Sequence, residues 1–284
     1  MILLTGAAGK TGRAVLKALV ERDQNVCVLV RNNKQADDLL AAGAVDAITG
    51  NMEDAGVYEK ALKNVNSLYH ICPNMHPEEL EIGNTIINAA IRNKLDLFVY
   101  HSVLHPQTEK MPHHWNKMRV EEMLFESGLG FTILQPAPYM QNILVSRKTV
   151  CNESVFRVPY PVLTRLSLVD LQDLARAAAA VLLEPGHKGA TYEIVGTGGL
   201  SQVAVAEQLS DFFGRDIAAE EQPLDEWRST AVKSGMNLYQ VETLIKMFTY
   251  YSRYGLVANS NVLRWLLNGE PGSLYNFIKR DFAE

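Results

Sequence analysis

A glycine-rich turn near the start of the chain is the feature that most constrains its fold. Residues 1–5 (MILLT) form an apolar run without polar alternation, which is typical of a strand buried in a parallel sheet. Gly6, Gly9 and Gly12 follow at three-residue spacing, and a helical apolar stripe then occupies residues 14–19. A buried strand that passes through such a turn into a helix predicts an α/β fold.

The alternation of strand and helix continues through the first half of the chain. Strands are expected over residues 26–30, 45–49, 67–72, 96–102 and 131–135, and helices over residues 34–42, 78–93 and 113–127. Strands separated by helices require crossover connections and pair in parallel. The sequence therefore predicts a doubly wound, parallel-sheet Rossmann fold.

After about residue 140 the alternation of strand and helix becomes less regular. We expect a helix over residues 170–183, a last strand over 192–195 and a helix over 201–213 that Ser201 caps. Only helical patterns, dense in aromatic residues, follow from Pro223 onward. We predict a nucleotide-binding Rossmann domain over residues 1–150 and a smaller, mostly helical, substrate-shaping region over 151–284, in which 165–196 packs back on the sheet.

Charge and cysteine usage exclude several functional classes. The 284 residues carry a net charge of -5 without a basic stripe, which disfavours direct binding to nucleic acid. Three scattered cysteines form no disulfide or metal-binding pattern, and the histidines lack metal-ligand spacing, so no metal site is expected. Without a signal segment or a long apolar stretch, we expect a cytoplasmic protein with no membrane contact.

Each glycine of the turn has a separate expected role. Gly6 permits the sharp exit from the strand, Gly9 lets a pyrophosphate approach the backbone, and Gly12 allows the helix to pack closely on the sheet. The N–H groups at the start of the helix then attract the anion. The alternative is a tight turn that binds nothing.

The end of the second expected strand predicts which dinucleotide binds. An acidic residue at this position accepts hydrogen bonds from the ribose of NAD, but here Arg31 follows Val30, and Lys34 lies one turn later. A guanidinium and an ammonium favour a 2′-phosphate, so NADP(H) is preferred over NAD(H). The alternative is that both cations belong to an ordinary solvated helix start.

Residues 1–200 resemble the NmrA-like family of atypical short-chain dehydrogenases/reductases. The segments that carry the resemblance are TGAAGKTGR, VLVRNNK, ITGN, YHICP, FVYHS, HHWNKMRVEEMLFESGLGFTILQPAPYMQN and VDLQDLARAAAAVL. The family holds reductases of quinones or other conjugated acceptors and also regulators that bind NADP and catalyse little. The resemblance therefore implies an oxidoreductase or a regulator.

The resemblance also implies a set of cofactor contacts. The pyrophosphate would lie against the glycine turn, the 2′-phosphate against residues 31–35, the adenine and ribose against the next two strand ends, and the nicotinamide against Lys117 and residues 137–140. The implied contacts are Thr5, Gly6, Ala7, Ala8, Gly9, Lys10, Thr11, Gly12, Arg31, Lys34, Asn51, Met52, Cys72, Pro73, Asn74, Lys117, Ala137, Pro138, Tyr139 and Met140.

The catalytic positions depart from the family pattern. Carbonyl-reducing members carry Tyr-x-x-x-Lys, and here Lys117 is present but His113 stands at the tyrosine position. Helical spacing places both on one stripe with Val120 and Leu124. Lys117, His113 and Ser102 are the candidate catalytic residues, although each also has a structural interpretation: a surface lysine, a pocket-lining imidazole beside an ammonium, and a strand cap.

Two functions remain open on the sequence alone. A chain without the tyrosine acid suits a quinone-like acceptor, because reduction of an extended conjugated system gives a delocalised product that can take its protons from solvent. The alternative is an NADP(H)-binding redox sensor with little catalysis, acting as a homodimer or through a regulatory protein partner. A nucleotide-sugar epimerase ranks last because such enzymes usually keep the tyrosine.

Overall fold

Seven strands form a parallel sheet at the centre of the fold. The computed structural model describes residues 1–283. The sheet order is β3-β2-β1-β4-β5-β6-β9. Its strands are β1 Ile2–Leu4, β2 Val26–Val30, β3 Asp46–Thr49, β4 Ser67–His70, β5 Leu97–His101, β6 Phe131–Pro136 and β9 Ala190–Ile194. The predicted Rossmann class is confirmed.

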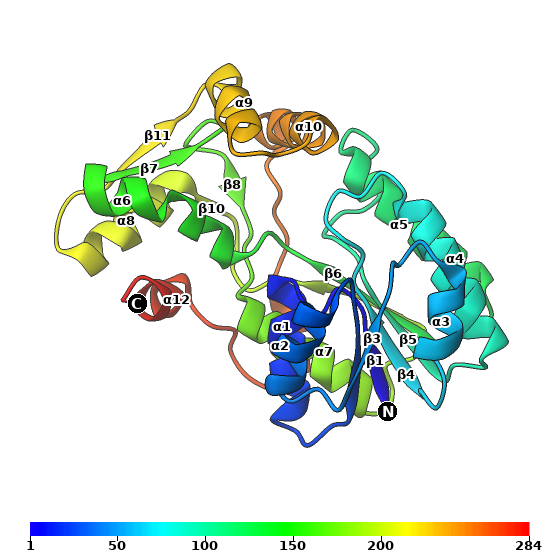
Figure 1. Cartoon of the computed structure of the whole chain (residues 1–284). Coiled ribbons are helices and arrows are strands. Elements are labelled where there is room, and N and C mark those ends of the chain that lie inside the picture. Colours follow the sequence, from blue (N-terminus) through cyan, green and yellow to red (C-terminus); the bar gives the residue numbers. More distant parts are fainter. Residues whose placement is uncertain (284) are drawn as a thin grey trace. The chain divides into compact units, whose positions relative to one another are not determined.

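Helices cover both faces of this sheet (Figure 1). One face carries α1 Lys10–Val20, α2 Asn33–Ala41 and α7 Leu171–Leu183. The other carries α3 Ala55–Ala61, α4 Glu79–Arg92 and α5 Pro112–Glu126. The strands in between are accordingly buried on both sides, which explains their continuous apolar sequences, for example the fully buried residues of β2.

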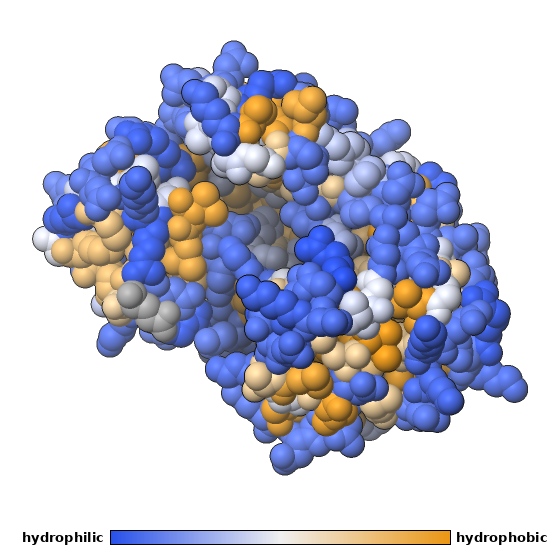
Figure 2. All heavy atoms as spheres, in the orientation of Figure 1, coloured by the Kyte–Doolittle hydropathy of each residue, from blue (hydrophilic) through white to orange (hydrophobic). Residues whose placement is uncertain are grey.

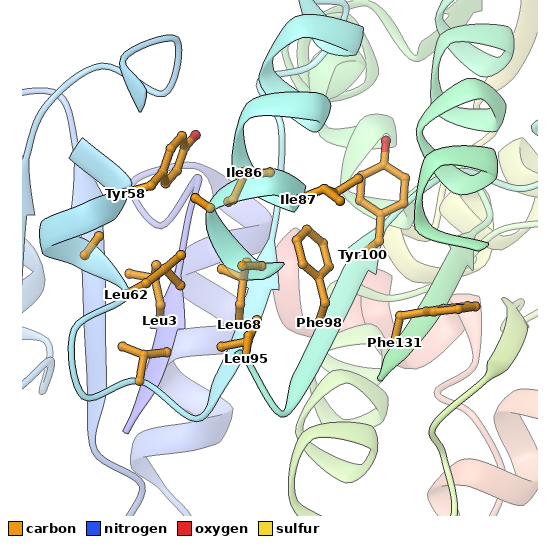
Figure 3. Packing of buried hydrophobic residues seen from close by; sticks show 14 of the residues in the cluster. Leu3, Tyr58, Leu62, Leu68, Ile86, Ile87, Leu95, Phe98, Tyr100 and Phe131 are labelled. Atoms are coloured by element: carbon orange, nitrogen blue, oxygen red, sulfur yellow. The ribbon is translucent and has the colours of Figure 1, made fainter. Parts of the chain in front are cut away.

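The core on the α3–α5 face is built from alternate strand residues. Leu3, Leu68 and Phe98 come from the adjacent strands β1, β4 and β5, and Figure 3 shows them side by side beneath Leu62 and Ile86 of the helical layer. All five are at most 2% exposed. Full burial of one such side chain contributes about 1.5–3 kcal/mol, so this layer is the principal source of stability on that face.

The chain divides into two compact units, and neither is continuous in sequence. Unit 1 contains residues 1–107, 113–135 and 174–192, and therefore nearly the whole sheet and its helices. Unit 2 contains residues 108–112, 136–173 and the chain from residue 193 onward. The sequence-based boundary at residue 150 stays a prediction.

Unit 2 contains two small sheets and several helices. Strand β11 pairs in parallel with β7, and β10 pairs antiparallel with β8. From Leu224 onward the described chain is helical, as predicted. The elements are η1 Met140–Ser146, α6 Arg147–Glu153, β7 Val155–Val158, β8 Arg165–Leu166, β10 Leu200–Ser201, α8 Gln202–Phe213, β11 Ala218–Glu221, α9 Leu224–Lys233, α10 Leu238–Tyr254, α11 Asn261–Leu267 and α12 Leu274–Asp281.

Apolar side chains reach the surface on the α9–α10 part of unit 2. Figure 2 shows hydrophobic residues over these helices. Val232 at the end of α9 is 45% exposed and Leu238 at the start of α10 is 68% exposed. Even so, none of the helices in residues 1–283 combines the length and the apolar character that crossing a bilayer requires.

Candidate functional site

The candidate site lies where the strand order of the sheet reverses. Strands β1 and β4 are neighbours at this point. After β1 the chain continues into α1 on one face of the sheet, and after β4 it continues into α4 on the opposite face. Ligands of doubly wound sheets bind outside the carboxyl ends of the strands at such a reversal. The glycine turn follows β1 and so lies at this place.

The geometry of the turn matches the expected roles of its glycines. Gly6 has a φ of +63°, and a Cβ there would lie 2.7 Å from the carbonyl oxygen of Ile71. A Cβ on Gly12 would come within 2.4 Å of the Gly6 carbonyl oxygen, which excludes any side chain. Gly9 is exposed, and a Cβ there would meet only one atom, at 3.4 Å, so its backbone is open to approach.

The start of α1 suits an anion. Gly9 caps the helix without a side-chain hydrogen bond, and the first turn contains no acidic residue. Backbone N–H groups at a helix start point toward a ligand, and the positive end of the helix dipole adds to the attraction for an anion. A glycine turn that is open at Gly9 and leads into a helix start fits the pyrophosphate of a dinucleotide.

Thr5 joins this turn to the loop that follows β4. Its hydroxyl accepts a hydrogen bond from the Ile71 N–H at 3.0 Å and contacts Nδ1 of His70 at 2.9 Å. His70 is 1% exposed, and burial together with Lys117 lowers its imidazole pKa to about 3. His70 is therefore neutral at pH 7, and its Nε2 has no partner in residues 1–283.

Most of the implied cofactor contacts gather at the carboxyl ends of four adjacent strands in unit 1. Residues 5–12 follow β1, Arg31 follows β2 and Lys34 lies in α2, Asn51 and Met52 follow β3, and Cys72, Pro73 and Asn74 follow β4. Ala137, Pro138, Tyr139 and Met140 follow β6 and belong to unit 2.

Arg31 and Lys34 are exposed cations at the end of β2. Asn32 caps α2 by accepting a hydrogen bond from the Gln35 N–H at 3.0 Å, and the Gln35 side chain accepts one from the Arg31 N–H at 3.0 Å. These bonds fix the backbone and leave both cationic heads in solvent. No described carboxylate lies within ion-pair distance of either head.

Lys117 forms a buried ion pair that the sequence does not indicate. Its Nζ lies 2.6 Å from Oε1 of Glu79 and donates to the His101 carbonyl oxygen at 3.3 Å. The Tyr100 hydroxyl, which Figure 3 shows at the outer end of its ring, donates to the same Glu79 oxygen at 3.1 Å. Lys117 is 6% and Glu79 1% exposed, so the ammonium charge is compensated inside unit 1.

The histidines around Lys117 are neutral. Burial, His114 and Lys117 lower the pKa of His113 to about 2, and its Nδ1 has no partner in the described chain. Burial likewise lowers the pKa of His101 to about 3 and that of His114 to about 4. At neutral pH none of these three imidazoles is in the imidazolium form that would serve as a general acid.

Ser102 belongs to a second buried polar group. Its hydroxyl donates to Oε1 of Glu121, and the Gln135 amide donates to both oxygens of the same carboxylate at 3.0 and 2.9 Å. Burial raises the pKa of Glu121, and the bonds from Ser102 and Gln135 oppose that change. Sequence reasoning missed Glu121, although it lies one helical turn after Lys117 on the same buried stripe.

Comparison with known proteins identifies the family. The model of the NmrA-like family matches residues 1–284. The chain belongs to the NmrA-like family.

Some of the relatives are named as reductases or oxidoreductases. The NAD(P)H azoreductase of Xenophilus azovorans is 27% identical over 83% of this chain and 82% of its own length. Quinone oxidoreductase 2 of Escherichia coli strain K12 is 26% identical over 95% of this chain and 94% of its own. The crystal structure of an NADPH-dependent quinone oxidoreductase from Escherichia coli in complex with NADPH has a TM-score of 0.88 at 25% identity, covering 99% of this chain and all of that one.

The Cys72 thiol, which is one of the implied cofactor contacts, is not activated as a nucleophile in this NmrA-like chain. Cys72 is 4% exposed, and burial together with Glu79 raises the pKa of its thiol. A protonated, buried thiol is a poor nucleophile. Across residues 1–283, no three His, Cys, Asp or Glu side chains gather closely enough to hold a metal ion.

Proposed function

We propose that this chain is an NADPH-dependent reductase of a quinone-like or other conjugated small molecule. The observation that carries the proposal is the open cradle at Gly9, placed at the reversal of the sheet between β1 and β4. The names of the azoreductase and quinone oxidoreductase relatives support the same reaction class. When bound, NADPH supplies the hydride.

The residues of unit 1 would bind and orient the cofactor. The N–H groups of the glycine turn and of the first turn of α1 would hold the pyrophosphate. Arg31 and Lys34, which have no carboxylate partner in the described chain, would bind the 2′-phosphate. Lys117 has three N–H donors, of which Glu79 and His101 occupy two, so the third would reach a ribose hydroxyl.

The acceptor class follows from the protonation of the site. An isolated ketone needs an acid beside the developing alkoxide, whereas the nearby imidazoles are neutral and Glu79 compensates the Lys117 charge. A quinone spreads the incoming charge over its ring system and can take protons from water. Neutral imidazoles and a charge-compensated Lys117 therefore favour a conjugated acceptor.

A turnover assay tests the proposal. We expect the protein to oxidise NADPH in the presence of at least one member of a panel of benzoquinones and naphthoquinones, at a rate well above the protein-free mixture. Simple ketones should give no acceleration. NADPH oxidation rates equal to those of the protein-free mixture with every quinone would contradict the proposed reductase activity.

A regulatory protein that binds NADP(H) is the second candidate, because neutral imidazoles beside Lys117 also suit a protein that catalyses little. A sensor must bind NADPH and NADP⁺ with different affinity, since a ligand shifts an equilibrium only through differential binding. Titration calorimetry with each form measures this difference. Equal affinities for NADPH and NADP⁺, together with quinone turnover, would favour the reductase over the sensor.

A further inference from the structure

A pocket on unit 2 has a composition that the proposed reaction does not explain. It has a volume of about 420 Å³, which is within the usual range for a small-molecule site. It lies between the segment before β8 and the end of α10. The lining residues that matter for its chemistry are Leu163, Arg165, Tyr251, Arg253, Tyr254 and Val257.

The charges of this pocket are all positive. Its lining includes two arginines but no aspartate or glutamate. The Arg253 guanidinium lies 5.3 Å from the centre of the Tyr254 ring, and the Lys110 ammonium lies 5.5 Å from the same centre. No described carboxylate is within ion-pair distance of Arg165, Arg253 or Lys110.

One of these cations is held in place. Arg165 donates from Nε and Nη2 to the carbonyl oxygen of Gly199, at 3.0 and 2.8 Å. This pair of bonds fixes the plane of the guanidinium and leaves Nη1 free to donate. A pre-oriented donor loses little conformational entropy when a ligand binds, so Arg165 is suited to hold an anionic group.

Much of the remaining lining is apolar or aromatic. Leu163 is 74% exposed and Val257 47% exposed, while the Tyr251 ring is almost fully buried. Tyr254 is half-exposed, and its ring lies 4.8 Å from the Tyr250 ring between centroids. A small inorganic anion would satisfy the arginines but leave these apolar surfaces in water.

We propose that this pocket binds an aromatic molecule that carries an anionic substituent, such as a sulfonate or carboxylate. The ring contacts Leu163, Tyr254 and Val257, and the anion accepts hydrogen bonds from Arg165 and Arg253. The proposal concerns unit 2 alone and does not depend on NADPH binding or on reductase activity.

Titration calorimetry with naphthalene-2-sulfonate tests the proposal, because this probe accepts no hydride. The titration is done with and without millimolar NADP⁺, and only binding that is the same in both is assigned to this pocket. We expect naphthalene-2-sulfonate to bind at least tenfold more tightly than naphthalene-2-sulfonamide, its neutral analogue, and than inorganic sulfate. Arg253→Gln should lower the sulfonate affinity about tenfold, and Arg165→Gln should do the same.

The matched control is Arg22→Gln, which removes an exposed arginine of unit 1 and should leave the affinity unchanged. Thermal melting of every variant confirms that it is folded. The proposal is overturned if naphthalene-2-sulfonate does not bind, if the sulfonamide or sulfate binds equally well, or if Arg253→Gln and Arg165→Gln both bind like the wild type. The quinone assay is scored separately, so either proposal can fail alone.

Discussion

At the residue scale, burial distinguishes two lysine–carboxylate pairs that have the same length. Nζ of Lys117 lies 2.6 Å from Glu79, and Nζ of Lys188 lies 2.6 Å from Asp96. The side chains of the first pair are 8% and 1% exposed, and those of the second are 53% and 69% exposed. Removal of one partner leaves a buried charge without compensation only in the first pair, so the two should differ strongly in their effect on stability.

We therefore expect Glu79→Gln to reduce the free energy of unfolding by about 3 kcal/mol, because Lys117 loses its counter-charge inside unit 1. Asp96→Asn should cost less than about 1 kcal/mol. Urea denaturation of both variants measures the difference. The double change Glu79→Gln with Lys117→Met should recover part of the loss, and equal costs for the two single changes would show that burial does not decide the energy of these pairs.

Arg31 provides a second prediction for a single residue. Arg31→Asp should weaken NADPH binding by about 2 kcal/mol or more, roughly thirtyfold, through the loss of charge-assisted hydrogen bonds and the added repulsion. NADH affinity should change little. Fluorescence titration with both cofactors measures this, with Arg22→Asp as the control at an exposed arginine. Unaltered NADPH affinity would mean that the 2′-phosphate is bound elsewhere.

At the scale of elements, the close contact between the glycine turn and α1 makes a steric prediction. Because a Cβ on Gly12 would lie 2.4 Å from the Gly6 carbonyl oxygen and 2.5 Å from the Ala7 Cα, α1 could not keep its position over β1. We expect Gly12→Ala to cost about 3 kcal/mol and to abolish stabilisation by NADP⁺.

Gly198→Ala is the matched control for that substitution. Nothing lies within 4 Å of a Cβ at Gly198, and its φ is not positive. This change should stay within about 0.5 kcal/mol of the wild type or stabilise slightly, because alanine restricts the unfolded chain. Thermal melts with and without NADP⁺ measure both effects. Similar melting temperatures for the two variants would contradict the steric argument.

Local sequence patterns were sufficient to predict several elements and caps. The β2 range of 26–30, the Ser201 cap of α8 and the buried stripe of His113, Lys117, Val120 and Leu124 are each readable from neighbouring residues. Contacts between residues that are distant in sequence could not be predicted in this way.

The missed features depend on long-range contacts. Glu79 is 38 residues away from Lys117, and no spacing rule connects a helix start after β4 with the stripe of α5. The pairing of β11 with β7 was missed because residues 218–221 (AAEE) are polar and mostly exposed, and their partner strand is about 60 residues earlier. The seven-residue helix α3 was missed because it is short and contains Gly56.

At the scale of the whole molecule, the histidines are distributed unevenly between the units. All seven histidines belong to unit 1. Four of them, His70, His101, His113 and His114, have pKa values between about 2 and 4 in the folded state. Because these values are lower than in the unfolded chain, the unfolded state binds more protons below pH 6.5, and the stability of unit 1 is lost as the pH falls from there.

We therefore expect unit 1 to unfold in mild acid before unit 2. Each of the four histidines can remove up to roughly 1.4 kcal/mol per pH unit below 6.5, a large fraction of a stability of about 5–15 kcal/mol. Hydrogen-exchange mass spectrometry, corrected for the intrinsic pH effect, should show that amides of unit 1 lose protection between pH 6.5 and 5 while those of unit 2 keep theirs. His114→Gln should reduce the slope by about a quarter, and protection that is constant down to pH 5 would contradict the prediction.

The late arrival of β9 has a consequence during synthesis. Strand β9 covers the edge of β6 in the sheet, yet it leaves the ribosome only after η1, α6, β7, β8 and α7. Until then a nascent chain presents the unpaired N–H and C=O groups of β6 to its surroundings. Once residue 194 has emerged from the ribosome, β9 can pair with β6, and chaperones lose access to this edge. A gene shortened to end before that point would leave the edge of β6 permanently exposed.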